Sequence, residues 1–171
     1  MKKQFIFCLL SLVVAASPAF SQDDKSKRAS PPAQVSETTA KGVTISIDYS
    51  QPSLKGRQIG VDIAPVGQVW RTGANEATVF EVSKDVKVEG QPLKAGKYSL
   101  YSIPGEQEAT IIFNKAWKQW GTVYNESEDA LRIKVSPSQA PEFTEKLTFL
   151  VDKSGSVIFR WGNSQAEFKV E

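Results

Sequence analysis

Short stretches in which apolar and polar residues alternate recur along most of the chain. In residues 43–49 (VTISIDY) every second side chain is apolar, so an extended backbone would place four apolar groups on one face. Four further segments repeat the pattern, at residues 131–135, 147–151, 157–161 and 166–170. After residue 21, no stretch of ten or more residues carries a convincing helical period. The alternation therefore predicts an all-β protein whose strands each bury one face.

Turn-forming residues separate these segments at the spacing expected for hairpins. They are Glu89-Gly90, Ala95-Gly96, Pro104-Gly105, Lys153-Ser154-Gly155 and Gly162-Asn163. About nine strands in roughly 135 residues fit one antiparallel β-sandwich, or a barrel-like variant of it. We expect this single domain to span residues 34–171.

The first 21 residues have the layout of a secretory signal peptide. Lys2 and Lys3 precede an apolar run at residues 5–16, and small residues, Ala19 and Ser21, stand where a signal peptidase reads the chain. The run is shorter than the roughly 20 apolar residues that a membrane-spanning helix needs. We expect cleavage near Ser21/Gln22, export to the periplasm or the medium, and no transmembrane segment in the mature chain. A retained N-terminal anchor is the alternative.

Residues 22–33 (QDDKSKRASPPA) are polar and charged and end close to two prolines. This composition is typical of a solvated linker, because it offers too little apolar surface to offset the entropy of ordering. We predict a short disordered tether before the β domain.

The composition of the exported part excludes several classes of function. Its net charge is near zero, because Lys2 and Lys3 account for the formal excess of +2. Nucleic-acid binders normally carry a positive excess, so we expect no nucleic-acid partner. The only cysteine, Cys8, lies in the signal, and the chain has no histidine. Histidine-based triads and zinc sites built from His or Cys are therefore excluded, and we expect neither metal nor cofactor.

Residues 69–78 (VWRTGANEAT) contain the first candidate site. Trp70 could stack on a ligand, Arg71 could clamp a carboxylate or phosphate, and Asn75 and Glu76 could add hydrogen bonds beside a flexible glycine. The alternative is structural: Arg71 and Glu76 pair with each other across a bend while Trp70 fills the core.

A second candidate lies in residues 114–124 (NKAWKQWGTVY), which join two predicted strands. Trp117, Trp120 and Tyr124 could offer an aromatic surface to sugar rings or peptide side chains, to which Tyr98 and Tyr101 could add. The alternative is that the two tryptophans plug one open end of the sandwich.

Several stretches of the chain resemble an exported bacterial family known as domain of unknown function 2911. They are residues 30–33 (SPPA), 47–50 (IDYS), 52–57 (PSLKGR), 69–78 (VWRTGANEAT), 95–100 (AGKYSL), 103–105 (IPG), 112–115 (IFNK) and 119–121 (QWG). Gln51 and Ala109 depart from the pattern, which has a basic residue and an aromatic there. The resemblance implies export, often to the periplasm of Gram-negative bacteria, and assigns no activity. Because its pattern includes Arg71, Asn75 and Glu76, it strengthens the binding interpretation of that segment.

The residues thus support three hypotheses. The first is a non-catalytic module that binds a polar ligand such as a glycan or a cell-envelope component. The second is a histidine-free hydrolase or lyase in which Glu76 or Asp48 acts as acid or base and Arg71 stabilises negative charge. The third is a structural or protein-interaction domain of the envelope. We favour the first; the sequence leaves the oligomeric state open.

Overall fold

The computed structural model describes residues 24–171, so the predicted signal peptide and its cleavage site lie outside the described residues. Within this range the chain forms ten β-strands and two single-turn 3-10 helices, and it contains no α-helix. The all-β prediction is confirmed, with one strand more than expected. No helix in residues 24–171 is long and apolar enough to cross a membrane.

Six strands form an antiparallel sheet in the order β1-β2-β3-β6-β7-β8. These strands are β1 (Pro32–Thr38), β2 (Thr44–Ser50), β3 (Thr78–Val82), β6 (Gly96–Ile103), β7 (Ala109–Asn114) and β8 (Asp129–Val135). The edge strands β1 and β8 are not paired with each other, so the sheet is open and the barrel-like variant does not form.

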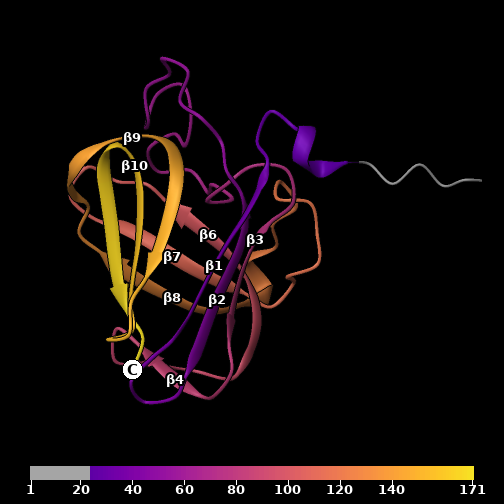
Figure 1. Ribbon diagram of the computed structural model, residues 1–171, viewed down its shortest axis with the longest axis vertical. Helices are drawn as coiled ribbons and strands as arrows, with labels where there is room; N and C mark the ends of the chain where they lie inside the picture. The colour runs from indigo at the N-terminus through magenta and orange to yellow at the C-terminus, as the bar shows by residue number, and fades with distance from the viewer. Residues whose placement is uncertain (1–23) are drawn as a thin grey trace, which may run out of the picture.

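A long hairpin of β9 (Ser138–Val151) and β10 (Ser156–Lys169) lies across one face of this sheet (Figure 1). Between the two layers, Phe80 of β3 and Phe113 of β7 contact Phe168 of β10, with ring centroids 6.0 and 5.7 Å apart. All three rings are fully buried. A small hairpin of β4 (Val86–Val88) and β5 (Gln91–Leu93) adds Val88 and Leu93 to the same core. The apolar faces predicted from the alternation thus meet in one core.

One predicted turn is wrong. Gly162-Asn163 lies inside β10, so the segments 157–161 and 166–170 belong to one strand rather than two. Gly162 has a φ of +60°, and the pairing of β10 with β9 shifts register on both sides of it. A glycine in the left-handed region suits a bulge as well as a turn, so the residue pair alone does not distinguish the two.

The first two residues of the predicted tether lie outside the described part of the chain, and the structure describes the rest of it. Residues Lys25–Lys27 form a 3-10 turn, and β1 begins at Pro32, which pairs with Ser50. Since β1 is an edge strand, a proline at its first position costs no hydrogen bond within the sheet. In Figure 1 this segment lies beside the loop that follows β2, at the top of the view.

Candidate functional site

A cavity of about 710 Å³ lies at the end of the sheet where β2 leads into the loop of residues 51–77. Residues of this loop form one wall of the cavity. Gly121, Thr122 and Tyr124, in the connection between β7 and β8, form the other wall. Four of the eight predicted site residues line it: Trp70, Arg71, Asn75 and Tyr101. The first candidate segment therefore forms one side of an open cavity rather than a closed piece of core.

The backbone beside Arg71 is held in an unusual conformation. Thr72 is completely buried and has a φ of +47°, in the left-handed region that β-branched residues avoid. Its hydroxyl bonds to Ser102 Oγ at 3.0 Å, and its carbonyl accepts a hydrogen bond from Thr78 Oγ1 at 2.9 Å. Such strain persists only where the surroundings enforce it, and it clusters at functional sites. These contacts fix the direction in which Arg71 leaves the chain.

Arg71 is half-buried and has no carboxylate partner among residues 24–171. Its Nε donates a long hydrogen bond, 3.4 Å, to the carbonyl of Gly73. Its stem lies against Gly121, where an added Cβ would come within 2.4 Å of Arg71 Cδ. The side chain is thus positioned by packing, and the two terminal nitrogens stay available to a ligand.

Glu76 points away from this cavity and binds the N-terminal segment. Its carboxylate lies 2.9 Å from Lys25 Nζ and accepts two hydrogen bonds from Arg28 Nη1, at 3.0 and 2.9 Å. The contact with Lys25, together with Arg28, lowers the pKa of Glu76 to about 2. The alternative in which Glu76 pairs with Arg71 is therefore wrong: the partners of Glu76 come from a segment some fifty residues earlier.

Asn75 also contacts the N-terminal segment. Its Nδ2 donates to the carbonyl of Ser30 at 3.0 Å, and its own carbonyl accepts from the backbone N–H of Gly121 at 3.0 Å. Asn75 has a φ of +58°, a conformation that asparagine tolerates better than most residues. It thus ties together Ser30 and Gly121, which line two sides of the cavity.

Trp70 is partly buried and lies flat against Trp161 of β10, with centroids 5.3 Å apart and ring planes 8° from parallel. It is fixed to the sheet by two backbone hydrogen bonds with Ser102. Besides the polar cavity, Trp70 borders a second, mostly apolar cavity of about 130 Å³ that Trp161 and Leu147 also line. The structural alternative is therefore partly correct for Trp70, because its ring packs on the core and also lines the cavity.

A protein-family model matches residues 30–170 and carries the description "Protein of unknown function (DUF2911)". The chain belongs to the DUF2911 family. The match covers every residue that lines the polar cavity, from Ser30 to Tyr124, whereas Lys25 and Arg28 lie before it. Searches of the curated proteins and of the solved structures found no match.

Tyr124 lies on the wall of the polar cavity and packs edge to face on Tyr101, with ring centroids 4.9 Å apart. Tyr101 is fully buried behind it, whereas Tyr124 is only partly buried. The Tyr101 hydroxyl donates to the carbonyl of Val123 at 2.7 Å and accepts from Gln119 Nε2 at 3.0 Å. The Tyr124 hydroxyl donates to Asp129 at 2.7 Å, and burial together with this carboxylate raises the pKa of Tyr124 to about 12. Both phenols stay neutral at physiological pH.

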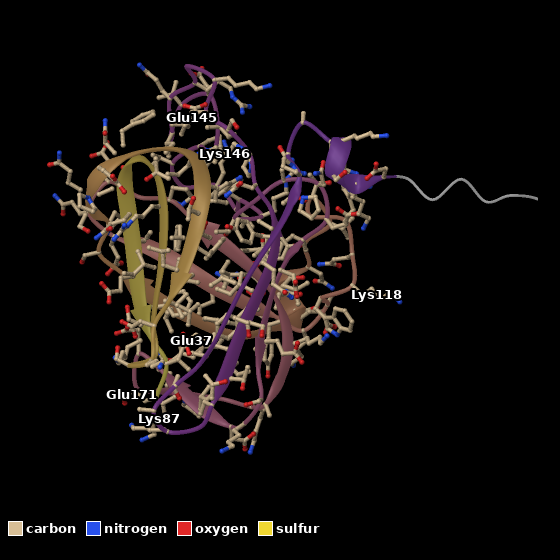
Figure 2. All side chains as sticks on the ribbon, in the orientation of Figure 1. Glu37, Lys87, Lys118, Glu145, Lys146 and Glu171 are labelled. Carbon is tan, nitrogen blue, oxygen red and sulfur yellow. The ribbon has the colours of Figure 1, made fainter. Side chains whose placement is uncertain are left out.

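Three predicted aromatic residues do not line this cavity. Tyr98 is buried on the core face of β6 and donates to the carbonyl of Lys94. Trp117 and Trp120 are 38% and 49% exposed, so neither plugs the sandwich. The ammonium group of Lys97 lies 5.1 Å from the centre of the Trp117 ring. Figure 2 shows Lys118, between these tryptophans in the sequence, pointing outward on the side away from the β9–β10 hairpin.

The acidic residues considered for catalysis also lie elsewhere. Asp48 accepts a hydrogen bond from Gln34 at 2.6 Å, and Glu81 pairs with Lys97 across the sheet at 3.4 Å. Asp62 is the one acidic residue among those that line the polar cavity. Within the described part of the chain, no cluster of three acidic, histidine or cysteine side chains could hold a metal ion.

Sequence reasoning proposed no site role for three residues that line the cavity: Ser30, Arg57 and Asp62. Gly121 and Tyr124, which also line it, lie within the second candidate segment. Arg57 closes one of the stretches that resemble the family, and it is held by hydrogen bonds to the carbonyls of Leu54 and Ser53, at 2.9 and 2.7 Å. The family resemblance is the one signal that could have singled it out, because alternation says nothing about loop residues.

Proposed function

We propose that this DUF2911 domain is a non-catalytic binding module, which acts after export and holds a polar ligand in the cavity beside Trp70 and Arg71. The observation that carries the proposal is the position of Arg71, half-buried in the cavity wall with no carboxylate to neutralise it. An unpaired guanidinium in such a place is costly unless water or a ligand satisfies it. Structural arginines are usually paired, so the arrangement favours binding.

The size and lining of the cavity fit a small polar molecule or the end of a longer chain. Its volume of about 710 Å³ lies within the range of ligand pockets. Trp70 and Tyr124 supply aromatic surface, and Arg71 and Asn75 supply polar groups at the edge of it. Flat aromatic rings with hydrogen-bonding neighbours suit sugar rings, so a glycan or a cell-envelope fragment is the ligand class we favour.

A histidine-free hydrolase or lyase is supported less well. Glu76 is engaged by Lys25 and Arg28, and a carboxyl group with a pKa of about 2 is a poor acid or base near neutral pH. Asp48 lies on the sheet beside Gln34 and away from Arg71.

An interaction domain of the envelope remains a second candidate, favoured by the exposure of Trp117 and Trp120. Large exposed aromatic residues are frequent at protein interfaces. A partner bound through these rings would leave the Arg71 cavity free.

Thermal-shift screening against glycans and cell-envelope fragments tests the binding proposal. We expect at least one compound to raise the melting temperature of the purified protein, and Arg71→Ala to abolish that rise. Arg160→Ala is the matched control, because Arg160 lies outside the polar cavity and bonds to Gln165 at 2.9 Å. A screen without a stabilising compound, or an Arg71→Ala protein that still responds fully, would contradict the proposal.

A further inference from the structure

The charges around the cavity are unbalanced in favour of cations. Two guanidinium groups, those of Arg57 and Arg71, line it, against the single carboxylate of Asp62. Asp62 is exposed, and its Oδ2 accepts a hydrogen bond from the backbone N–H of Gln58 at 2.9 Å rather than pairing with either arginine. Glu76, the acidic residue closest in sequence to Arg71, is neutralised by Lys25 and Arg28. The field in the cavity is therefore positive, although the domain as a whole is nearly neutral.

The backbone next to Arg71 adds hydrogen-bond donors. Gly73 and Ala74 line the cavity, and their N–H groups have no acceptor anywhere in residues 24–171. They stand between Thr72 and Asn75, which have φ values of +47° and +58°. Successive free N–H groups in a turn that includes left-handed residues form a concavity that suits anions. This observation is independent of the arginine side chains.

We infer that the ligand of this cavity carries an oxyanion, a carboxylate or a phosphate, which binds to the terminal nitrogens of Arg71. The free N–H groups of Gly73 and Ala74 support the same anion, and the charge of Arg57, which also lines the cavity, strengthens the attraction. The inference rests on the proposed binding function and narrows it: an acidic glycan or a phosphorylated envelope component fits, and a neutral sugar lacks the group that Arg71 requires.

Arg71 is suited to this role because it is held in place before a ligand arrives. Its stem packs on Gly121, and the strained Thr72 beside it is fixed by Ser102 and Thr78. A planar guanidinium binds an oxyanion through two parallel hydrogen bonds, and a pre-positioned one loses little entropy when it does so. An arginine that served only solubility would not need such packing.

Calorimetric titration with matched pairs of probes tests the inference. One arm compares trigalacturonate with its methyl ester, and the other compares glucose 6-phosphate with glucose, with inorganic phosphate added alone. In at least one arm the anionic probe is expected to bind about tenfold more tightly than its neutral partner. Arg71→Gln is expected to lower the affinity for the anionic probe by about 10- to 100-fold and to leave the affinity for any neutral probe unchanged. Arg160→Gln, which removes a guanidinium outside the cavity, should change neither.

The arm that responds distinguishes a carboxylate from a phosphate ligand. Equal affinity for charged and neutral probes, no anionic binding at all, or an Arg71→Gln protein that binds anions normally would each overturn the inference. If a neutral compound still stabilises the protein through the cavity, the binding proposal survives that failure. A measurement on the unaltered protein tests the inference even if the variants misfold. Raising NaCl from about 0.05 to 0.5 M should lower the affinity for the anionic probe several-fold and leave the affinity for the neutral probe unchanged.

Discussion

Arg28 binds Glu76 through a single nitrogen, Nη1, which donates to both carboxylate oxygens at 3.0 and 2.9 Å. Lys25 Nζ adds a third contact at 2.9 Å. The pair joins the segment before β1 to the turn that carries Arg71, across 48 positions of the chain. Because Glu76 is engaged on this side, its charge does not cancel that of Arg71 on the other.

Replacing Glu76 by glutamine should loosen the N-terminal segment. The substitution removes the charge that holds Lys25 and Arg28, while Asn75 keeps its bond to Ser30. We expect trypsin to cleave after Arg28 about two- to fivefold faster in Glu76→Gln, since partly exposed ion pairs contribute on the order of 0.5 to 1 kcal/mol. Mass spectrometry of timed digests measures the rate. Glu81→Gln is the control, because it removes a similar pair with Lys97 on the sheet; equal rates in all three proteins would contradict the prediction.

The same pair predicts a dependence of stability on pH. The pKa of Glu76 is lowered from 4.5 to about 2 in the folded protein, so folding favours its charged form. The stabilisation is therefore complete above pH 4.5 and is lost as the pH falls towards 2. Glu76→Gln resembles the protonated acid, so its deficit in the free energy of unfolding should be about 1 kcal/mol or less at pH 7 and should vanish near pH 2. Urea unfolding of both proteins across this range checks it; a deficit that stays constant would show that Glu76 does not act through its charge.

Gly121 supports Arg71, and Gly121→Ala should disturb it without removing its charge. An added Cβ would lie 2.4 Å from Arg71 Cδ and 2.9 Å from the carbonyl oxygen of Asn75, both too close. We expect a loss of about 1 to 3 kcal/mol in unfolding free energy from the crowding. Any ligand that responds to Arg71→Ala should also bind more weakly. Gly67→Ala is a useful comparison, because a Cβ there meets nothing within 4 Å, although its φ of +76° carries a strain cost of its own.

The alternation of apolar residues identified β2, β8 and parts of β9 and β10, where apolar side chains on one face enter the core. It did not identify β6 and β7, which bury consecutive residues on both faces and so show no alternation. In β8, Leu131, Ile133 and Val135 are buried and the residues between them are exposed, as expected from the sequence. Alternation failed at Gly162, where turn-forming residues serve as a bulge inside a strand of 14 residues. A bulge and a turn use the same backbone conformations, and only the partner strand distinguishes them.

The site was harder to predict, because its contacts join loops that are distant in sequence. The sequence singled out the segment from Trp70 to Glu76 as one unit, but its polar residues divide between two sides of the chain. Arg71 faces the cavity, whereas Glu76 faces Lys25 and Arg28. No local pattern could show this division, since it depends on a positive φ at Thr72 and on where the N-terminal segment runs.

The hydroxyl of Thr78 holds the strained turn in place, so Thr78→Val should weaken both the fold and the site. Thr78 is completely buried, and its Oγ1 donates to the carbonyl of Thr72 at 2.9 Å. Valine has nearly the same shape but leaves that buried carbonyl without its donor, which costs about 1 to 3 kcal/mol. Thermal or urea unfolding measures the loss. Thr38→Val, on the exposed face of β1, should change stability by less than about 0.5 kcal/mol; a similar loss in both variants would contradict the role given to Thr78.

Substitutions of three tryptophans separate the two candidate functions. Trp120 is 49% exposed and lies outside the polar cavity, so Trp120→Ala should cost less than about 1 kcal/mol of stability and leave ligand binding unchanged. Trp117→Ala should behave similarly, apart from the loss of its contact with Lys97.

Trp70→Ala should instead destabilise the fold by about 3 kcal/mol or more, because it removes the ring stacked on Trp161. It should also weaken ligand binding. Unfolding curves and titrations of the three variants give both quantities for each. If Trp120→Ala abolished ligand binding while Trp70→Ala retained it, the ligand would bind the exposed aromatic surface, and the interaction hypothesis would replace the cavity as the better account of function.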